Sequence, residues 1–235
     1  MLRIPFIRLL AVLAVAACAA PVAANMVVDR SIIRFAPGEP VRTDVTVANR
    51  DSEPLFVQVE VHEVVHPGSA EEVRVELTPD MQLPLLVSPD KLVLAGGQTK
   101  LLRLVNLAGS GDVERIFRVT LRPVPPPAEV KQSGIRLFVA YELLVIVAPQ
   151  RGTAELRSQR IGNRLIFENQ GNTNVMLHSG RQCAEALPGD NDEPTCVAFR
   201  GNRVYPGNVW ELELPYSTPV EFTVADGDRS SRRAF

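Results

Sequence analysis

The sequence lacks the features that mark most enzymes and nucleic-acid-binding proteins. It has no Gly-x-Ser-x-Gly string, no phosphate-binding loop and no dinucleotide-binding fingerprint. No basic block stands out in a chain of net charge −2 and pI near 6.0, so nucleic acid is not an expected partner. No apolar run in the mature part reaches the roughly 18 residues of a transmembrane helix, and stable membrane insertion is not expected. These absences favour a non-enzymatic protein without a cofactor or metal.

The first 24 residues have the composition of a secretory signal. They contain, in order, a charged start at Arg3 and Arg8, the apolar run Leu9 to Ala17 and the small-residue cleavage site Val22-Ala23-Ala24. Cleavage there would take the net charge to −4, because 25 basic residues less two leave 23 against 27 acidic ones. The string Val15-Ala16-Ala17-Cys18 also resembles a lipoprotein cleavage box, so lipidation of Cys18 is an open alternative. The sequence therefore predicts an exported protein.

Cleavage would leave only two of the three cysteines, Cys183 and Cys196. A pair of cysteines in an exported chain typically forms a disulfide, which we predict here. Two free thiols are the alternative. A metal site is less favoured, because only His178 lies nearby and the ligand set would be incomplete.

From Met26 onward the sequence consists of short alternating stretches separated by turn residues, with no convincing helix. Strands at this spacing are typical of β-sandwiches. The pattern restarts after Pro149 in a shorter half, so we predict an all-β chain with domains at 25–148 and 149–235. The charged tail 226–235 is expected to fray. The strands predicted in the first half are Met26–Phe35, Val41–Asn49, Leu55–Val65, Glu72–Leu77, Leu85–Leu94, Lys100–Leu107 and Arg115–Arg122.

One further stretch, Ile135 to Val147, alternates for long enough to form a single strand of about 40 Å. All its odd-numbered positions are apolar, and prolines punctuate it on both sides. A strand of this length outruns the usual sheet, so we expect its apolar row to be offered to another chain. The alternative is that the row is ordinary sandwich core.

The string His62-Glu63-Val64-Val65-His66 matches the His-Glu-x-x-His pattern of zinc proteases. That pattern binds zinc only on a helix, where the two histidines share one face. Here it ends an alternating stretch and is followed at once by Pro67-Gly68, which indicates a strand. On a strand the histidines would lie roughly 13 Å apart, too far to share one ion.

Several segments follow one another in a recognisable order. They are Val28-Asp29-Arg30-Ser31, Val45-Thr46-Val47-Ala48-Asn49, Ser88-Pro89 with Leu94-Ala95-Gly96-Gly97-Gln98, Glu114 to Pro126, the long strand ending at Pro149, Leu165 to Asn169, and Val204-Tyr205-Pro206-Gly207. Together, these segments resemble the PapD-like periplasmic pilus chaperones. The resemblance implies two immunoglobulin-like domains set at an angle, a periplasmic location, and pilus subunits and an outer-membrane usher as partners. It also implies donor-strand complementation, in which the chaperone lends a strand to an incomplete pilin. The residues that would fill the pilin groove are Ile135, Leu137, Val139, Tyr141 and Leu143.

The chain departs from this family in its basic residues. Well-known members of the family anchor the C-terminal carboxylate of the pilin with an arginine and a lysine. In this chain the corresponding positions are occupied by Ile32 and Leu144. Arg30 and Arg34 flank the first position and are candidate substitutes. In lacking the anchors the chain is similar to the archaic or alternative chaperone–usher branch.

Arg103 and Glu114 match two members of an interdomain salt-bridge cluster of the family, so the resemblance implies an ion pair between them. The third member, an aspartate in the second domain, has no clear counterpart.

Three other functions stay open at this point. The protein could serve a surface polymer other than a pilus, or be a structural pilin or adhesin. A pilin is usually one incomplete sandwich, whereas this chain supplies two sets of strands. The third alternative is a secreted zinc protease, which rests on the histidine string alone.

Overall fold

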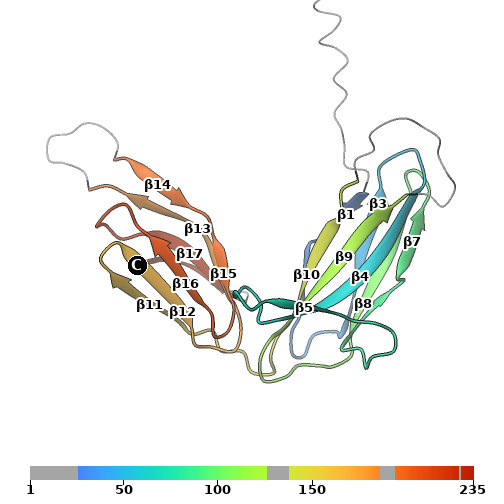
Figure 1. Ribbon diagram of the computed structural model, residues 1–235, viewed down its shortest axis with the longest axis horizontal. Helices are drawn as coiled ribbons and strands as arrows, with labels where there is room; N and C mark the ends of the chain where they lie inside the picture. Colours follow the sequence, from blue (N-terminus) through green and yellow to red (C-terminus); the bar gives the residue numbers. More distant parts are fainter. Residues whose placement is uncertain (1–25, 126–137, 186–193, 228) are drawn as a thin grey trace, which may run out of the picture.

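A computed structural model describes residues 26–125, 138–185, 194–227 and 229–235, and these parts contain β-strands and no helix. The strands form two bodies that meet at one end and diverge at the other, so the molecule has the shape of a V (Figure 1). The prediction of an all-β chain with two sandwiches set at an angle is confirmed. The change from one sandwich to the other falls between Val147 and Leu156.

The first domain packs two sheets around one apolar core. One sheet has the order β1 (Met26–Val28), β3 (Arg42–Asn49), β8 (Thr99–Asn106), β6 (Leu85–Ser88). The other has the order β2 (Ile32–Phe35), β10 (Tyr141–Val147), β9 (Arg115–Val124), β4 (Leu55–Val65), β5 (Val73–Glu76), and β7 (Lys91–Leu94) also pairs with β4. Alternate residues of both sheets, such as Leu104 and Phe117, are almost fully buried between them.

Two stretches that we predict as single strands are each divided between the two sheets. Met26–Phe35 forms β1 in one sheet and β2 in the other, and Leu85–Leu94 forms β6 and β7 in the same manner. The first break lies at Asp29, whose carboxylate accepts a hydrogen bond from the Thr46 amide at 2.9 Å. The second lies at Pro89, which has no N–H to donate to a ladder. Each stretch therefore closes one edge of the sandwich by changing sheets.

The second domain is smaller and has an aromatic core. Its first sheet is β11 (Leu156–Ile161), β12 (Arg164–Asn169), β16 (Val209–Glu213). Its second is β14 (Cys196–Phe199), β13 (Val175–Cys183), β17 (Glu221–Asp226), β18 (Arg229–Ala234), with β15 (Asn202–Val204) also on β13. Phe167 lies at the centre, with Trp210 stacked at 5.5 Å between ring centroids and Phe222 edge-on at 5.9 Å.

The predicted frayed tail is instead a strand. β18 pairs with β17 along its whole length, and Phe235 exchanges two backbone hydrogen bonds with Val220. The Phe235 ring stands edge-on to Phe167 at 4.8 Å. The prediction is wrong because one terminal aromatic side chain enters the core and holds the charged strand in place.

Cys183 and Cys196 form the predicted disulfide, as facing residues of β13 and β14. Replacing both cysteines by alanine should lower the free energy of unfolding of the second domain by about 3 kcal/mol, because the unfolded chain loses a cross-link. Denaturant unfolding followed by Trp210 fluorescence measures this loss. An unchanged midpoint in the double variant would contradict a stabilising role for the disulfide. Mass spectrometry of the unreduced wild type, with its two-hydrogen deficit, is the control.

Candidate functional site

β10 loses one of its two neighbouring strands part-way along its length. It pairs with β9 from Tyr141 to Val147, but with β2 only from Leu144 to Val147. On the β2 side, no strand of the described chain pairs with the backbone of residues 141–143. An uncovered strand edge of this kind is where an additional strand can join a sheet.

The odd-numbered side chains of β10 leave the core of their own domain at this same place. Leu143, Val145 and Val147 are at most 2% exposed and belong to the core. Tyr141 is half-buried against that core, and Val139, which precedes the strand, is 44% exposed. The core of the first domain therefore covers the odd-numbered side chains only from about Tyr141 onward.

The long strand predicted from 135 to 147 is shorter in the structure. It begins at Tyr141, and residues 138–140 are not in a strand. Leu143 is wrongly predicted to face another chain, because it is fully buried in the core of its own domain. Ile135 and Leu137 lie outside the described residues.

The even-numbered side chains of β10 face the second domain. Leu144 and Ile146 pack with Val64 and Ile116 of neighbouring strands and with Tyr205, which follows β15 in the second domain. Tyr205 is only 6% exposed, and burial raises the pKa of its phenol. The interface between the two domains thus has an apolar centre.

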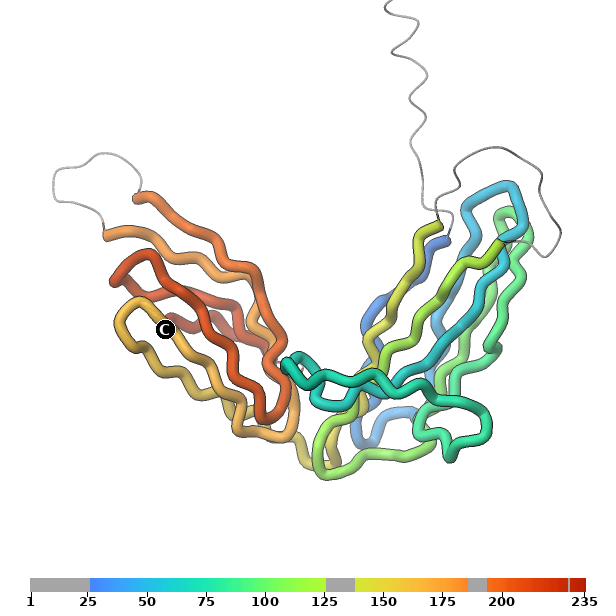
Figure 2. The backbone as a smooth tube through the Cα atoms, in the orientation of Figure 1, coloured from blue at the N-terminus to red at the C-terminus, as the bar shows by residue number. Residues whose placement is uncertain are grey.

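The tip of the β4–β5 hairpin forms a second contact between the domains. Figure 2 shows this hairpin, in teal, reaching across to the second domain. The Asn208 side chain donates a hydrogen bond to the Pro67 carbonyl at 2.7 Å. Gly68 has φ of +71°, and a Cβ atom there would lie 2.9 Å from the Tyr205 ring. The turn and the close approach both require glycine at this position.

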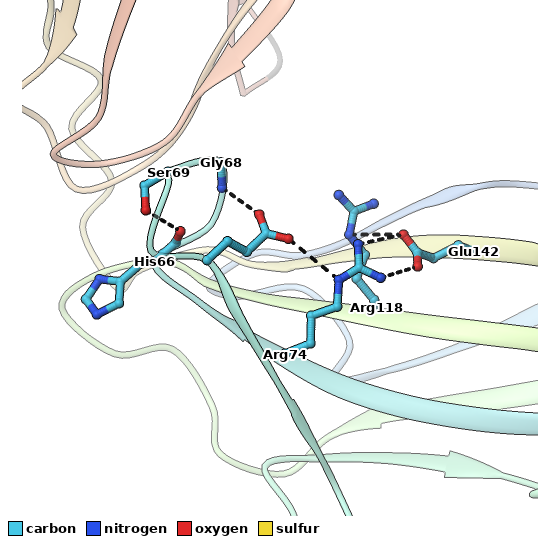
Figure 3. A network of polar contacts seen from close by, with 7 residues as sticks. His66, Gly68, Ser69, Arg74, Arg118 and Glu142 are labelled. Carbon is cyan, nitrogen blue, oxygen red and sulfur yellow. Dashed lines mark hydrogen bonds and ion pairs between the residues drawn. The ribbon is translucent and has the colours of Figure 1, made fainter.

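A chain of charged groups runs from this tip to β10 (Figure 3). Glu72 accepts a hydrogen bond from the Gly68 amide at 2.8 Å and lies 3.6 Å from Arg74. Arg74 donates to Glu142 at 2.6 Å, and Arg118 lies 3.5 Å from the same carboxylate. The hydrogen bond to Glu142 raises the pKa of Arg74. The hairpin tip and β10 are therefore joined by ion pairs.

Arg103 and Glu114 do not form the predicted ion pair. Arg103 makes two hydrogen bonds to Asp44, at 2.8 and 2.9 Å, within the first domain. These bonds lower the pKa of Asp44. Glu114 is buried and accepts hydrogen bonds from Thr173 and Asn174 of the second domain. The prediction is thus wrong for the pair, although Glu114 does lie between the domains.

Of the two candidate anchors, only Arg34 lies at the interface. Ile32 and Leu144, where the family's anchors would fall, are direct neighbours on β2 and β10. Arg34 lies on the same face of β2 as Ile32, and a Cβ atom added at Gly227 in the second domain would lie 3.4 Å from its guanidinium. Arg30 lies in the turn before β2, exposed and paired with Asp29 at 3.2 Å.

The histidine string lies on a strand, as predicted. Residues 62–65 belong to β4, and His66 follows in a turn with φ of +52°. Glu63 makes two hydrogen bonds to Arg115, at 2.8 and 2.9 Å. Among the residues that the structure describes, no three histidine, cysteine or acidic side chains gather as metal ligands would.

A family model described as the PapD N-terminal domain of pili and flagellar-assembly chaperones matches residues 25–152. The chain belongs to this family. The resemblance seen in the sequence therefore predicts the family correctly. Tyr205, which packs against the first domain, lies in one of the resembling segments, but nothing in that segment indicates the contact.

Two curated relatives of this PapD-family chain come from Escherichia coli. The B subunit of CS1 fimbriae is 25% identical over 71% of this chain and 72% of its own length. The A subunit of CFA/I fimbriae is 23% identical over 69% of each.

Solved structures of pilus chaperones share the fold across both domains. The class 5 fimbriae chaperone CfaA matches with a TM-score of 0.63 at 19% identity, covering 89% of this chain and 98% of its own. The Salmonella enterica complex of SafA pilin with SafB chaperone gives 0.62 at 19%, covering 92% and 99%. The archaic CsuC–CsuE complex of Acinetobacter baumannii gives 0.60 at 13%, covering 90% and 98%. Scores this similar do not single out one branch of the family.

The described part of this PapD-family chain contains no helix long and apolar enough to cross a membrane.

Proposed function

We propose that the protein is a periplasmic, non-enzymatic chaperone that binds pilus subunits along β10 by donor-strand complementation and passes them to an outer-membrane usher. The observation that carries the proposal is the coincidence of two changes near Tyr141. There β10 loses its second neighbouring strand, and there the apolar row leaves the core.

These two changes supply the two parts of strand addition. An uncovered edge offers main-chain hydrogen bonds to an incoming sheet, and alternate side chains fill pockets in it. Val139 is the described member of the row outside the core, and the period of two in the sequence puts Leu137 and Ile135 next in line. Burying one such side chain in the groove of a pilin would contribute about 1.5–3 kcal/mol.

The relatives support pilus subunits as the partners. Two of the matched structures are complexes of a chaperone with a pilin or a tip adhesin. The curated relatives are named fimbrial subunits, which keeps a structural role in the fibre as a second candidate. The chain matches both domains of a solved chaperone, which favours a chaperone over a structural subunit of the fibre.

In this proposal Arg34, rather than Arg30, is the candidate anchor for the carboxylate of the bound pilin. Arg34 lies beside Ile32 and Leu144 at the interface, whereas Arg30 is engaged by Asp29. The secretory composition of residues 1–24 supports export to the periplasm.

The test is co-purification from periplasm. The tagged chaperone is expressed with the small exported proteins encoded next to its gene, and we expect one of them to co-purify and to be degraded when the chaperone is absent. If none co-purifies and their periplasmic levels do not depend on the chaperone, the proposal is wrong. Capture of a non-pilus surface protein instead would favour a chaperone for another surface polymer. Delivery to the usher is tested separately, by the loss of pili from cells that contain the usher but lack the chaperone.

A further inference from the structure

β5 lies at an edge of its sheet and is exposed along its whole length. It pairs with β4 on one side, and on its other side no strand of the described chain pairs with it. All of its residues, from Val73 to Glu76, are exposed. β9 and β4 separate this edge from β10, so binding at β5 is independent of the pilin site proposed on β10.

The backbone groups that point out of this edge belong to Arg74 and Glu76. The Leu77 amide donates a hydrogen bond to the Val61 carbonyl of β4 at 2.8 Å. Because hydrogen-bonded and non-hydrogen-bonded pairs alternate in an antiparallel ladder, residues 73, 75 and 77 bond to β4, whereas residues 74 and 76 point away from it. A strand added at this edge would therefore bond to Arg74 and Glu76.

The side chains of these two residues carry opposite charges, which sets β5 apart from the other strands at sheet edges. Among the edge strands that the structure describes, β2, β11 and β18 have only arginines as charged residues, β16 has only glutamates, and β1, β6 and β14 have none. Within its own chain Arg74 pairs with Glu72 and Glu142, but Glu76 has no ion pair in the described residues. β5 is therefore the edge strand whose charges are complementary to those of a second copy of itself.

Antiparallel pairing of β5 with β5 of a second copy, about a two-fold axis, allows three registers in which residues 74 and 76 bond across the axis. Two of them put like charges opposite each other, Arg74 against Arg74 or Glu76 against Glu76, which is destabilising. The third puts Arg74 of each copy opposite Glu76 of the other. The same register puts Val75 opposite Val75 and Val73 opposite Leu77, so it aligns the apolar residues as well as the charges.

The odd-numbered face of β5 borders an apolar cavity that this pairing would help to cover. The cavity has a volume of about 550 Å³, and Val75, Leu77, Met81 and Leu107 are among the residues that line it. Val75 is 39% exposed, Met81 44% and Leu107 56%. Apolar side chains exposed beside an uncovered strand edge favour burial against a second polypeptide.

We propose that β5 is a dimerisation edge, at which two copies of the protein join their sheets in the register that places Arg74 opposite Glu76. In each copy Glu76 gains the cation that it lacks in the single chain. A pair of such short strands falls below the roughly 1,200 Å² at which stable interfaces begin, so the dimer is weak and forms only at high concentration.

The experiment is small-angle X-ray scattering of the purified mature protein at concentrations from about 10 µM to about 1 mM, the range in which a small interface associates. For the wild type we expect the forward scattering per unit mass to rise with concentration, up to twofold. Glu76→Arg places two arginines opposite each other, and Glu76→Pro removes an outward N–H without breaking the ladder to β4, so both should stay monomeric. An equimolar mixture of Glu76→Arg with Arg74→Glu should regain the rise, because every opposed pair then has opposite charges.

Glu213→Arg makes the same change of charge on β16, an edge strand of the second domain, and should dimerise like the wild type. Val139→Asp should also dimerise, since Val139 precedes β10 and not β5. A wild type that stays monomeric would overturn the proposal and leave the β5 edge to a strand of a different protein. The proposal is equally wrong if folded Glu76 variants dimerise normally, or if Val139→Asp loses the dimer, which would place the contact at β10. Glu76→Arg and Glu76→Pro decide the question if Arg74→Glu fails to fold.

Discussion

Replacing Val139 by aspartate is expected to abolish capture of the pilin while the unfolding midpoint of the chaperone stays within error of the wild type. Val139 is 44% exposed, so its side chain contributes little to the core of its own domain. In the groove of a pilin, however, the new carboxylate would be buried without a partner, which costs several kcal/mol. The measurements are a periplasmic pull-down and a denaturant melt of the same purified variant.

The matched control is Val145→Asp, in the same row of the same chain segment. Val145 is fully buried in the first domain, so the same chemical change should destabilise that domain by at least about 4 kcal/mol. Leu137→Asp should behave as Val139→Asp does. A Val139→Asp variant that still captures the pilin would show that another face receives it, and one that fails to fold would show that Val139 supports the fold of its own domain.

Replacing Tyr205 by alanine is expected to separate the unfolding of the two domains. The ring is 6% exposed and packs on Val64, Ile116, Leu144 and Ile146, all of the first domain. Removing a large buried aromatic side chain typically costs about 3–5 kcal/mol. Since the lost contacts lie between domains, we expect calorimetry to show two thermal transitions for the variant where the wild type shows one.

Tyr205→Phe is the control, because it keeps the ring that fills the interface and removes only the hydroxyl group. It should unfold in one transition near the wild-type temperature. If Tyr205→Ala also unfolds in a single, unshifted transition, the domains are coupled by other contacts. The hairpin tip, through Asn208 and Pro67, would then be the next element to test.

Alternation in the sequence predicted most of the strands and the all-β fold, but it could not predict which layer covers each face. Val139 and Leu143 have the same parity and the same chemistry in the sequence. Only the position of the opposite sheet makes Leu143 a core residue and leaves Val139 exposed. Changes of sheet within Met26–Phe35 were invisible for the same reason, since a strand has the same pattern in either sheet.

The charged residues were harder still to predict. The sequence offers several acidic residues that could pair with Arg103. The register between β3 and β8 places Asp44 directly opposite it. Glu114 was correctly associated with the interface through the family resemblance, whereas its partners Thr173 and Asn174 carry no local signal at all. Such partners depend on the angle between the domains, which no local pattern encodes.

The shared row along β10 has a consequence for how this protein can change during evolution. Under the proposed function, a substitution at Val139 can change the choice of pilin with little effect on the fold, because that side chain lies outside the core. An insertion or deletion within β10 has no such freedom. A one-residue change between Tyr141 and Leu143 would either move Leu143, Val145 and Val147 out of the core or reverse the faces presented by the residues before them. We therefore expect homologues with different cargoes to vary in side chains along this segment while its length from Tyr141 to Pro149 stays fixed.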